Sequence, residues 1–311
     1  MKPLVICGPT ASGKTELALE IARQSHGIIV SADSRQVYQR LTIGTAKPQG
    51  VWKNNIYYVD DIPYHLVDFL DVTETFNAGN FCTHVQQIAA AHPTAPLIFA
   101  GGTGLYLHAY FVGMDALPRS TPQLRRTLEE LRITRGKKGL HRALQEKDPV
   151  SAAQIPAGNV QRVMRALELC LLTGKPASEL KSGKFFQLPS TEKSCWVYLA
   201  WSKEILQQRI ELRSERIFDG MVAETEALLN EGYTADTAAL KSLGYPQAMA
   251  YLQGRLTREQ AVAEISLKTR QYAKRQRTWF NRYTNAHRIH LEKPEDFDIK
   301  CLAEKIIDRW R

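Results

Sequence analysis

A glycine-rich stretch near the N-terminus has the spacing of a phosphate-binding loop. It fits the pattern G-x-x-x-x-G-K-[ST] in full and comprises Gly8, Pro9, Thr10, Ala11, Ser12, Gly13, Lys14 and Thr15, which we name the phosphate loop. Glycines let the backbone wrap closely around phosphate oxygens, so that N–H groups and the following helix N-terminus point at the anion. Lys14 adds a positive charge, and the Thr15 hydroxyl can bind Mg²⁺. The loop predicts binding of a di- or triphosphate without saying which.

One carboxylate stands out as a partner for this loop. Enzymes that split a nucleotide γ-phosphate usually carry a second acid at the end of another strand. The third predicted strand instead runs into Gly101-Gly102-Thr103-Gly104, without an acid, whereas Asp33 follows the second strand. The ends of neighbouring parallel strands share one crevice, so Asp33 should face the phosphate loop. It could bind Mg²⁺ or act as a general base, and the alternative is a turn or helix cap.

The elements that must position these groups alternate between strands and helices. Short apolar runs predict buried strands at 4–7, 28–30 and 97–100, and helical spacing marks residues 14–26. Continuous apolar strands separated by helices favour a parallel sheet covered on both faces. The fold class is therefore α/β, a parallel sheet flanked by helices.

The sequence pattern changes between residues 113 and 190, where no apolar run resembles a strand. Basic residues crowd this region, and the spacing over 160–173 predicts a helix that stops at Gly174. The sheet resumes at 196–200, and helices are expected at 203–218, 222–230, 257–281 and 299–311, with a strand at 287–291. We expect one domain from residues 1–112 and 191–311, with an all-helical domain, 113–190, inserted into it.

Composition bounds the class of protein and of partner. The 311 residues are 44% hydrophobic and 23% charged, as in globular proteins, and 41 Lys and Arg against 32 Asp and Glu give a net charge of +9. This balance suggests an anionic partner. Five scattered cysteines suggest reduced thiols in a cytosol. No apolar run could span a membrane and no signal peptide is evident, so a cytoplasmic protein is expected.

The positive charge is concentrated in two regions. One is the predicted helical insertion, and the other is the stretch between Glu264 and Glu292, which contains no acid but many Lys, Arg and aromatic residues. Basic residues neutralise phosphates and aromatic rings stack on unpaired bases, so RNA is the favoured partner of the cations. For the aromatic rings, an amphipathic helix with its rings in the core is the preferred alternative.

Taken together, the motifs resemble the tRNA dimethylallyltransferase family, also called tRNA isopentenyltransferases or IPP transferases, in its bacterial form. The resemblance rests on five segments whose order and spacing cover nearly the whole chain. They are the phosphate loop, 33–38 with 43–48, 101–106, 159–168 and 274–280. It implies a phosphate-loop NTPase-like fold with a helical insertion that clamps the tRNA anticodon stem-loop.

The resemblance also implies a reaction. A dimethylallyl group would pass from dimethylallyl diphosphate to N6 of the adenine at tRNA position 37, beside the anticodon, with Mg²⁺ as cofactor and pyrophosphate leaving. Asp33 would accept the N6 proton, and Thr10 would bond the diphosphate or the leaving oxygen. Arg213 matches a family arginine that binds the diphosphate, although Ile217 replaces the usual Met. An arginine on a solvated helix face is an equally weighted alternative. Thr15 is the implied metal ligand.

Residues implied to contact tRNA come from several segments of the chain. Those near the base are Asp33, Ser34, Arg35, Gln36 and Thr103. Those in the insertion are Arg125, Gln161, Arg162, Val163, Met164 and Arg165. Those nearer the C-terminus are Lys241, Gly244, Tyr245, Lys274, Arg275, Gln276 and Arg277. Nothing in the sequence demands more than a monomer.

Two other functions compete with this interpretation. A small-molecule kinase would share the phosphate loop but bind and consume ATP without RNA. An RNA-binding protein with a relict nucleotide site would not depend on Asp33.

Overall fold

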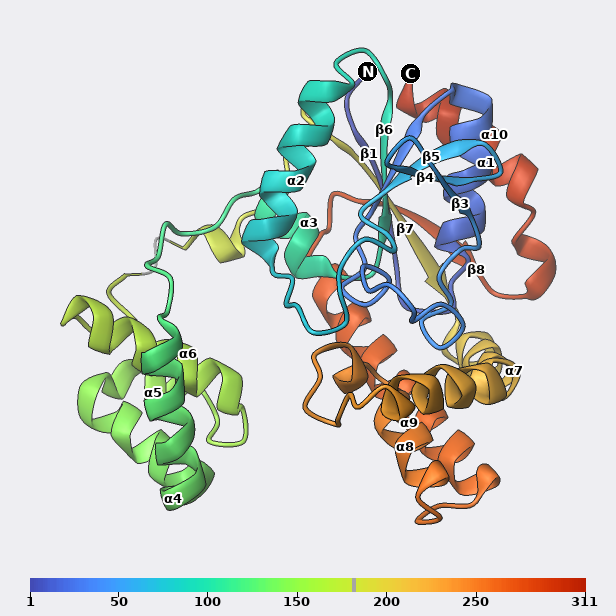
Figure 1. Cartoon of the computed structure of the whole chain (residues 1–311). Helices are drawn as coiled ribbons and strands as arrows, with labels where there is room; N and C mark the ends of the chain where they lie inside the picture. Colours follow the sequence, from blue (N-terminus) through green and yellow to red (C-terminus); the bar gives the residue numbers. More distant parts are fainter. Residues whose placement is uncertain (181–182) are drawn as a thin grey trace. The chain divides into compact units, whose positions relative to one another are not determined.

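The computed structural model describes residues 1–180 and 183–311 and contains two compact units (Figure 1). Met1–Val112 and Leu188–Arg311 form the first, which we call the sheet unit, and Gly113–Gln187 form the second, the helical unit. Residues 188–190, expected in the insertion, belong to the sheet unit. The reason is local, because the Pro189 carbonyl accepts a hydrogen bond from Asn285 and the Ser190 carbonyl accepts one from Ser194.

Within the part of the chain that the structure describes, the sheet has eight strands in the order β3-β4-β5-β2-β6-β1-β7-β8. Their bounds are β1 Leu4–Cys7, β2 Ile28–Ser31, β3 Val51–Lys53, β4 Ile56–Val59, β5 Ile62–His65, β6 Leu97–Gly101, β7 Cys195–Trp201 and β8 His287–Leu291. All pairings from β5 to β8 are parallel, whereas β3–β4 and β4–β5 are antiparallel. The mostly parallel α/β fold is confirmed, but the antiparallel edge was not predicted.

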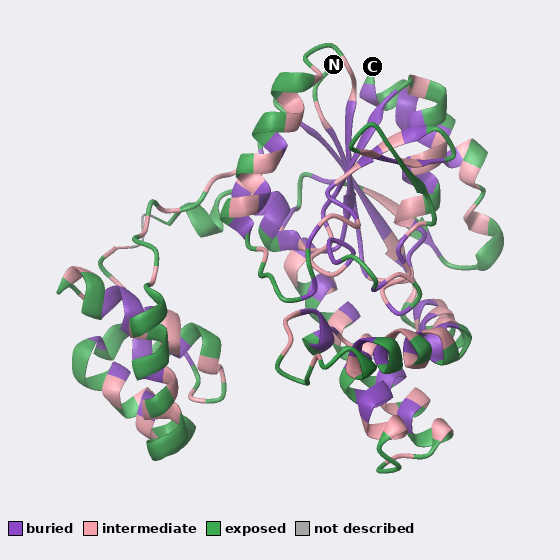
Figure 2. Cartoon of the chain, in the orientation of Figure 1, coloured by how far each residue is buried: buried purple, intermediate pink, exposed green. Residues whose placement is uncertain are grey.

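Helices cover both faces of the sheet, which explains its apolar strands. Along β1, Leu4 and Ile6 point to the core under α1 (Lys14–Ser25) and α10 (Ile299–Trp310). Val5 and Cys7 point to the opposite core, under α2 (Ala78–Ala91) and α3 (Gly104–Phe111). Side chains alternate along a strand, so a strand buried on both faces must be apolar throughout. Figure 2 shows these strands as the most deeply buried part of the unit.

A third core joins α7 (Lys203–Asn230), α8 (Tyr245–Leu252) and α9 (Arg258–Phe280) to residues 37–41 and 70–72. The sequence predicted two helices where α7 is continuous. Gly220 stands between the two predicted helices but lies within α7, and a Cβ there would come within 2.6 Å of the Ile43 side chain. The glycine therefore permits close packing rather than ending the helix.

The helical unit has its own core. Its helices are α4 (Pro122–Lys147, interrupted at Gly136), α5 (Pro149–Gln154) and α6 (Val160–Thr173). Leu128, Leu140 and Leu144 of α4 are buried together with Val163 and Leu167 of α6. Three single-turn 3₁₀ helices complete the described secondary structure, at Lys184–Phe186, Ala239–Lys241 and Pro294–Asp296. Among the described helices, none combines the length and the apolar character that crossing a membrane requires.

Candidate active site

A cavity of about 900 Å³ opens where β1, β2 and β6 end. Thr10 to Thr15 of the phosphate loop line one side of it, and Asp33 and Gly101–Gly102 line the strand ends. Residues 42–43 and 45–49 and part of α7 complete the wall. The structure therefore brings the loop and Asp33 to one site, as expected for neighbouring parallel strands.

The phosphate loop takes the curved backbone that an anion cradle needs. Gly13 has φ 87° and stands at the start of α1, while Ala11 also lies in the left-handed region with φ 62°. The Lys14 ammonium is partly buried and donates to the Pro9 carbonyl at 2.5 Å and to the Ser12 hydroxyl at 3.3 Å. Burial lowers the pKa of Lys14 to about 8, although the nearby Asp33 carboxylate acts in the opposite direction. An anion bound in the cavity would raise the pKa of Lys14 again, because it would stabilise the charged ammonium group.

The Asp33 carboxylate both caps a turn and lines the cavity. One carboxylate oxygen, Oδ1, accepts hydrogen bonds from the backbone N–H groups of Arg35 at 2.8 Å and Gln36 at 3.2 Å. Asp33 also lines the cavity beside the loop. The turn-cap interpretation and the functional one are thus compatible, because they need different oxygens of the same carboxylate.

Thr103 connects this turn to the end of β6. Its hydroxyl accepts a hydrogen bond from the Ser34 N–H at 3.0 Å, and its own N–H donates to the Ala32 carbonyl at 3.0 Å. Burial raises the pKa of the nearby Tyr272 hydroxyl to about 12, and the Thr103 side chain acts in the opposite direction. Thr103 therefore fixes the position of the Asp33 turn relative to the sheet.

Three arginines on one face of α7 line the cavity: Arg209, Arg213 and Arg216. Arg213 Nη1 donates to the Thr10 hydroxyl at 3.2 Å. Burial lowers the pKa of the Arg213 guanidinium, and the Asp33 carboxylate opposes that shift. Arg213 is thus a cavity residue and not part of a solvated face. Arg209 and Arg216 were not predicted from the sequence, although the i, i+4, i+7 spacing of the three arginines could have identified them.

Several residues implied to contact tRNA lie instead in structural positions. Val163 is fully buried in the helical core, and Tyr245 is fully buried with its hydroxyl bonded to Glu224 at 2.7 Å. Gly244 has φ 100°, and a Cβ there would come within 2.6 Å of the Met221 side chain. These positions give all three residues a packing role, and their implied contacts with tRNA stay predictions.

Two glutamines of the same group also have structural partners. Gln36 is buried, and its amide donates to the Ala46 carbonyl at 3.0 Å, which fixes the loop beside the cavity. Gln276, buried on α9, donates to the Gly102 carbonyl at 3.0 Å and accepts from the Thr10 N–H at 2.8 Å. Both line the cavity, so they shape the site, and their implied contacts with tRNA stay predictions.

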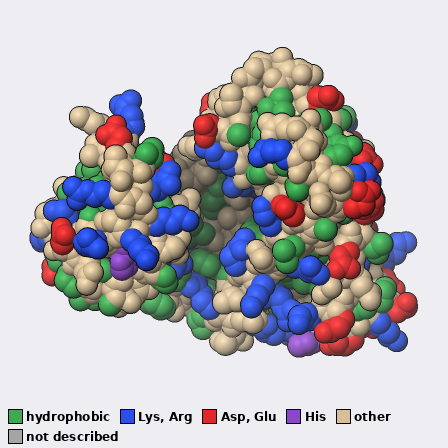
Figure 3. Space-filling model, turned by 90° about the horizontal axis from the view of Figure 1, so that it is seen from below, with side chains coloured by type: hydrophobic (Ala, Val, Ile, Leu, Met, Phe, Trp, Pro, Cys, Tyr) green, Lys and Arg blue, Asp and Glu red, His purple; other side chains and the backbone are tan. Residues whose placement is uncertain are grey.

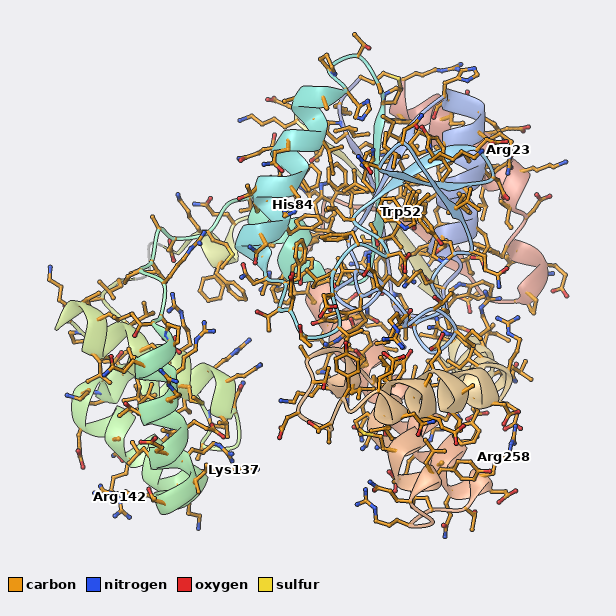
Figure 4. The ribbon with its side chains drawn as sticks, viewed as in Figure 1. Arg23, Trp52, His84, Lys137, Arg142 and Arg258 are labelled. Carbon is orange, nitrogen blue, oxygen red and sulfur yellow. The ribbon has the colours of Figure 1, made fainter. Side chains whose placement is uncertain are left out.

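The remaining implied tRNA contacts are accessible to solvent. In the sheet unit these are Ser34, Arg35, Thr103, Lys241, Lys274, Arg275 and Arg277, and in the helical unit they are Arg125, Gln161, Arg162, Met164 and Arg165. Arg125 and Arg165 both pair with the buried Glu168, at 3.4 and 3.2 Å. Figure 3 shows Lys and Arg side chains over the surfaces of both units, and in Figure 4 Lys137 and Arg142 point away from the helical unit.

The site offers oxygen ligands for a divalent cation but no dedicated protein cage. The Thr15 hydroxyl and the Asp33 carboxylate line the same cavity. Among the residues that the structure describes, no group of three or more His, Cys, Asp and Glu side chains is placed to hold a metal. Mg²⁺ commonly uses one or two protein oxygens, water and substrate phosphates, so this donor set fits it.

Comparison with known proteins identifies one group of relatives. The family model described as IPP transferase matches residues 36–283, and the one described as isopentenyl transferase matches residues 1–63. A tRNA dimethylallyltransferase of Elusimicrobium minutum is 48% identical over 287 residues, which is 92% of this chain and 93% of that protein. Its counterpart from Myxococcus xanthus is 41% identical over 285 residues, 91% of this chain and 90% of that protein.

Solved structures agree with this grouping. A tRNA isopentenylpyrophosphate transferase from Bacillus halodurans superposes with a TM-score of 0.67 at 30% identity and covers 99% of this chain and 96% of its own. A eukaryotic dimethylallyltransferase acting on tRNA gives a TM-score of 0.74 at 22% identity, over 98% of this chain and 77% of its own. At that identity the second comparison supports the fold alone.

Proposed function

Because this chain belongs to the IPP transferase family, we propose that it is a tRNA dimethylallyltransferase that moves a dimethylallyl group from dimethylallyl diphosphate to N6 of adenine 37. The observation that carries the chemistry is the placement of Asp33 in the same cavity as the phosphate loop. An anion site beside a carboxylate suits a reaction in which a diphosphate leaves while a proton is removed. The small-molecule kinase is not favoured, because the similar proteins are tRNA dimethylallyltransferases.

The donor's diphosphate would bind in the phosphate loop. Lys14 and Arg213 supply positive charge at the cavity, and Thr10 lies within reach of Arg213. When C1 of the dimethylallyl group separates from oxygen, negative charge develops on the leaving diphosphate. Preorganised N–H groups and cations stabilise such charge most where water is excluded. We assign these residues to holding the leaving group.

Mg²⁺ would be held by Thr15, together with donor phosphate oxygens. When bound, it would neutralise charge on the departing pyrophosphate. This role adds to that of Lys14 and does not replace it.

Asp33 would act on the acceptor. The N6 nitrogen forms a bond to C1 as the C1–O bond breaks, and the nitrogen must lose a proton to become neutral. The carboxylate oxygen that is not used in the turn can take that proton. The adenine must leave its stack to enter the cavity, as in other enzymes that modify a base. Exposed cations of α9 and of the helical unit would hold the RNA backbone.

The decisive experiment combines the protein with dimethylallyl diphosphate and unmodified tRNA that reads codons starting with U. We expect pyrophosphate release only when RNA is present, and product tRNA heavier by one dimethylallyl group. Position 37 is checked by fragment mass analysis. ATP consumption on a small acceptor, without any change in tRNA mass, would contradict the proposal.

A further inference from the structure

The phosphate loop is held by side chains from four different elements. These are Gln276 from α9, Arg209 from α7, Trp201 from β7, and Phe297 from the segment before α10. We call these four residues the loop clamp. None of them belongs to the loop itself, and each contacts a different one of the four consecutive residues Thr10 to Gly13.

The contacts are specific in direction. Gln276 Oε1 accepts from the Thr10 N–H at 2.8 Å. Arg209 Nε donates to the Ala11 carbonyl at 2.8 Å, and Trp201 Nε1 donates to the Ser12 carbonyl at 3.0 Å. The Phe297 ring lies against Gly13, where a Cβ would come within 2.2 Å of it. When loop N–H groups turn toward an anion, carbonyls turn outward and need donors, which Arg209 and Trp201 supply.

Ala11 is the residue that most needs such support. Its φ of 62° lies in the left-handed region, which disfavours a side chain with a Cβ. Such a conformation persists when the surroundings over-determine it, and Arg209 bonds the carbonyl of this residue. Arg209 is itself fixed, because its guanidinium lies 4.6 Å from the Trp201 ring centroid and 5.7 Å from that of Phe297.

We propose that Arg209 is a positioning residue that keeps Ala11 left-handed and so preorganises the phosphate loop for the donor's diphosphate. The inference rests on the proposed function only in assuming that the loop binds a diphosphate. It assigns Arg209 a role through the loop backbone. The competing role is a direct charge contact with the anion, since Arg209 also lines the cavity.

The two roles are separated by a double-mutant cycle. Affinity for inorganic pyrophosphate is measured by titration calorimetry, without RNA, for the wild type, Arg209→Leu, Ala11→Gly and the double variant. Glycine adopts the left-handed region without cost, so Ala11→Gly removes the need for support. We expect Arg209→Leu to weaken binding roughly 5- to 30-fold in the wild-type background, and by less than about threefold in the Ala11→Gly background.

An equal loss in both backgrounds would overturn the inference and assign Arg209 to direct charge contact. Absence of pyrophosphate binding by the wild type would instead contradict the proposed function. A second variant covers the case in which Arg209→Leu fails to fold. Trp201→Phe keeps a ring for packing but removes the donor to the Ser12 carbonyl, and we expect weaker pyrophosphate binding from it as well.

Steady-state kinetics give an independent readout. If the phosphate loop of Arg209→Leu becomes ordered only when the donor binds, the donor KM of this variant should rise and its tRNA KM should stay unchanged. Arg258→Ala is the matched control, because Arg258 is an arginine on α9 that pairs with Glu215 and Asp219 rather than with the loop. A rise in both KM values for Arg209→Leu would indicate general loosening and would overturn the assignment.

Discussion

At the scale of single residues, the role that we propose for Asp33 would have one carboxylate serve both structure and chemistry. Its Oδ1 holds the turn that follows β2, through the N–H groups of Arg35 and Gln36. An alanine substitution would therefore disturb the turn as well as the chemistry. Asparagine separates the two, since its amide oxygen can still accept from the backbone but cannot take a proton.

We predict that Asp33→Asn lowers kcat by about 10²- to 10⁴-fold, the usual contribution of a general base. The affinity for inorganic pyrophosphate and for tRNA should stay within about threefold of the wild type, because the turn and the loop are retained. Single-turnover rates with saturating donor and tRNA give the measurement. A kcat near that of the wild type would exclude Asp33 as the proton acceptor.

Individual residues also show which parts of the site can be predicted from the sequence. The phosphate loop and Asp33 could be identified because strand ends in a parallel sheet meet at one edge. The family resemblance implies that Gln276 and Tyr245 contact tRNA, and the structure shows them bonded to Thr10 and Glu224. A motif indicates which residue type a position requires, but it does not indicate whether that residue contacts the substrate or the neighbouring protein.

At the scale of elements, α7 connects both walls of the cavity. It carries the arginines 209, 213 and 216 near its start, and Glu224 further along. The Glu224 carboxylate accepts from the backbone N–H groups of Thr42, Ile43 and Gly44 at 2.8, 2.6 and 3.1 Å. One helix thus positions guanidinium groups on one side and the 42–44 backbone on the other.

We predict that Glu224→Gln lowers the free energy of unfolding by about 1–3 kcal/mol, because the amide nitrogen would replace an acceptor that backbone donors need. The donor KM should rise as well, since Thr42 and Ile43 line the cavity. Urea unfolding and donor kinetics test this. Glu226→Gln, an exposed position on the same helix, is the control and should change neither quantity.

Prediction of the elements succeeded where burial dictates the pattern. The strands at the sheet centre are apolar throughout, and α6 begins and ends within the residues expected from its spacing. The antiparallel edge from β3 to β5 was not predicted, because β3 is three residues long and exposed along its whole length and so has no burial pattern. Its pairing follows from the neighbouring strand and not from its own sequence.

The helical unit contains a pH-dependent element at the start of α5. Asp148 is fully buried; its Oδ1 accepts from the Ser151 N–H and the Ser178 hydroxyl, and its Oδ2 accepts from the Ser178 N–H. Burial alone would raise the pKa of Asp148, but these hydrogen bonds outweigh it and lower the pKa to about 2. The folded state therefore favours the ionised form more than the unfolded chain does.

We predict that this carboxylate contributes about 2 kcal/mol to the helical unit above pH 4 to 5, and that the contribution is lost as the pH falls through about 2. Asp148→Asn should lose that stability at neutral pH, and the difference from the wild type should shrink as the pH falls below 4 and vanish below pH 2. Hydrogen exchange of the α5 amides in the full chain reports it. A difference that stays constant with pH would contradict the assignment.

At the scale of the whole molecule, we propose that the exposed positive charge and the phosphate loop bind anions of different size. The loop and the α7 arginines surround a cavity suited to a diphosphate, whereas Lys274 and Arg275 of α9 are exposed. In the helical unit, Lys137 and Arg142 are exposed as well. Exposed cations that bind an RNA backbone release counterions, so their contribution depends on salt concentration.

We predict that tRNA affinity falls linearly with salt on logarithmic axes, and that Lys274→Ala combined with Arg275→Ala reduces the slope by up to about 2. Pyrophosphate affinity should not change, because neither residue lines the cavity. Arg258→Ala is again the control, since its charge is already paired with Glu215 and Asp219 and should add little to the slope. Filter binding of tRNA between roughly 50 and 200 mM salt gives the slopes. An unchanged slope for the double variant would remove α9 from the RNA-binding surface and leave the excess charge of the helical unit as the remaining candidate.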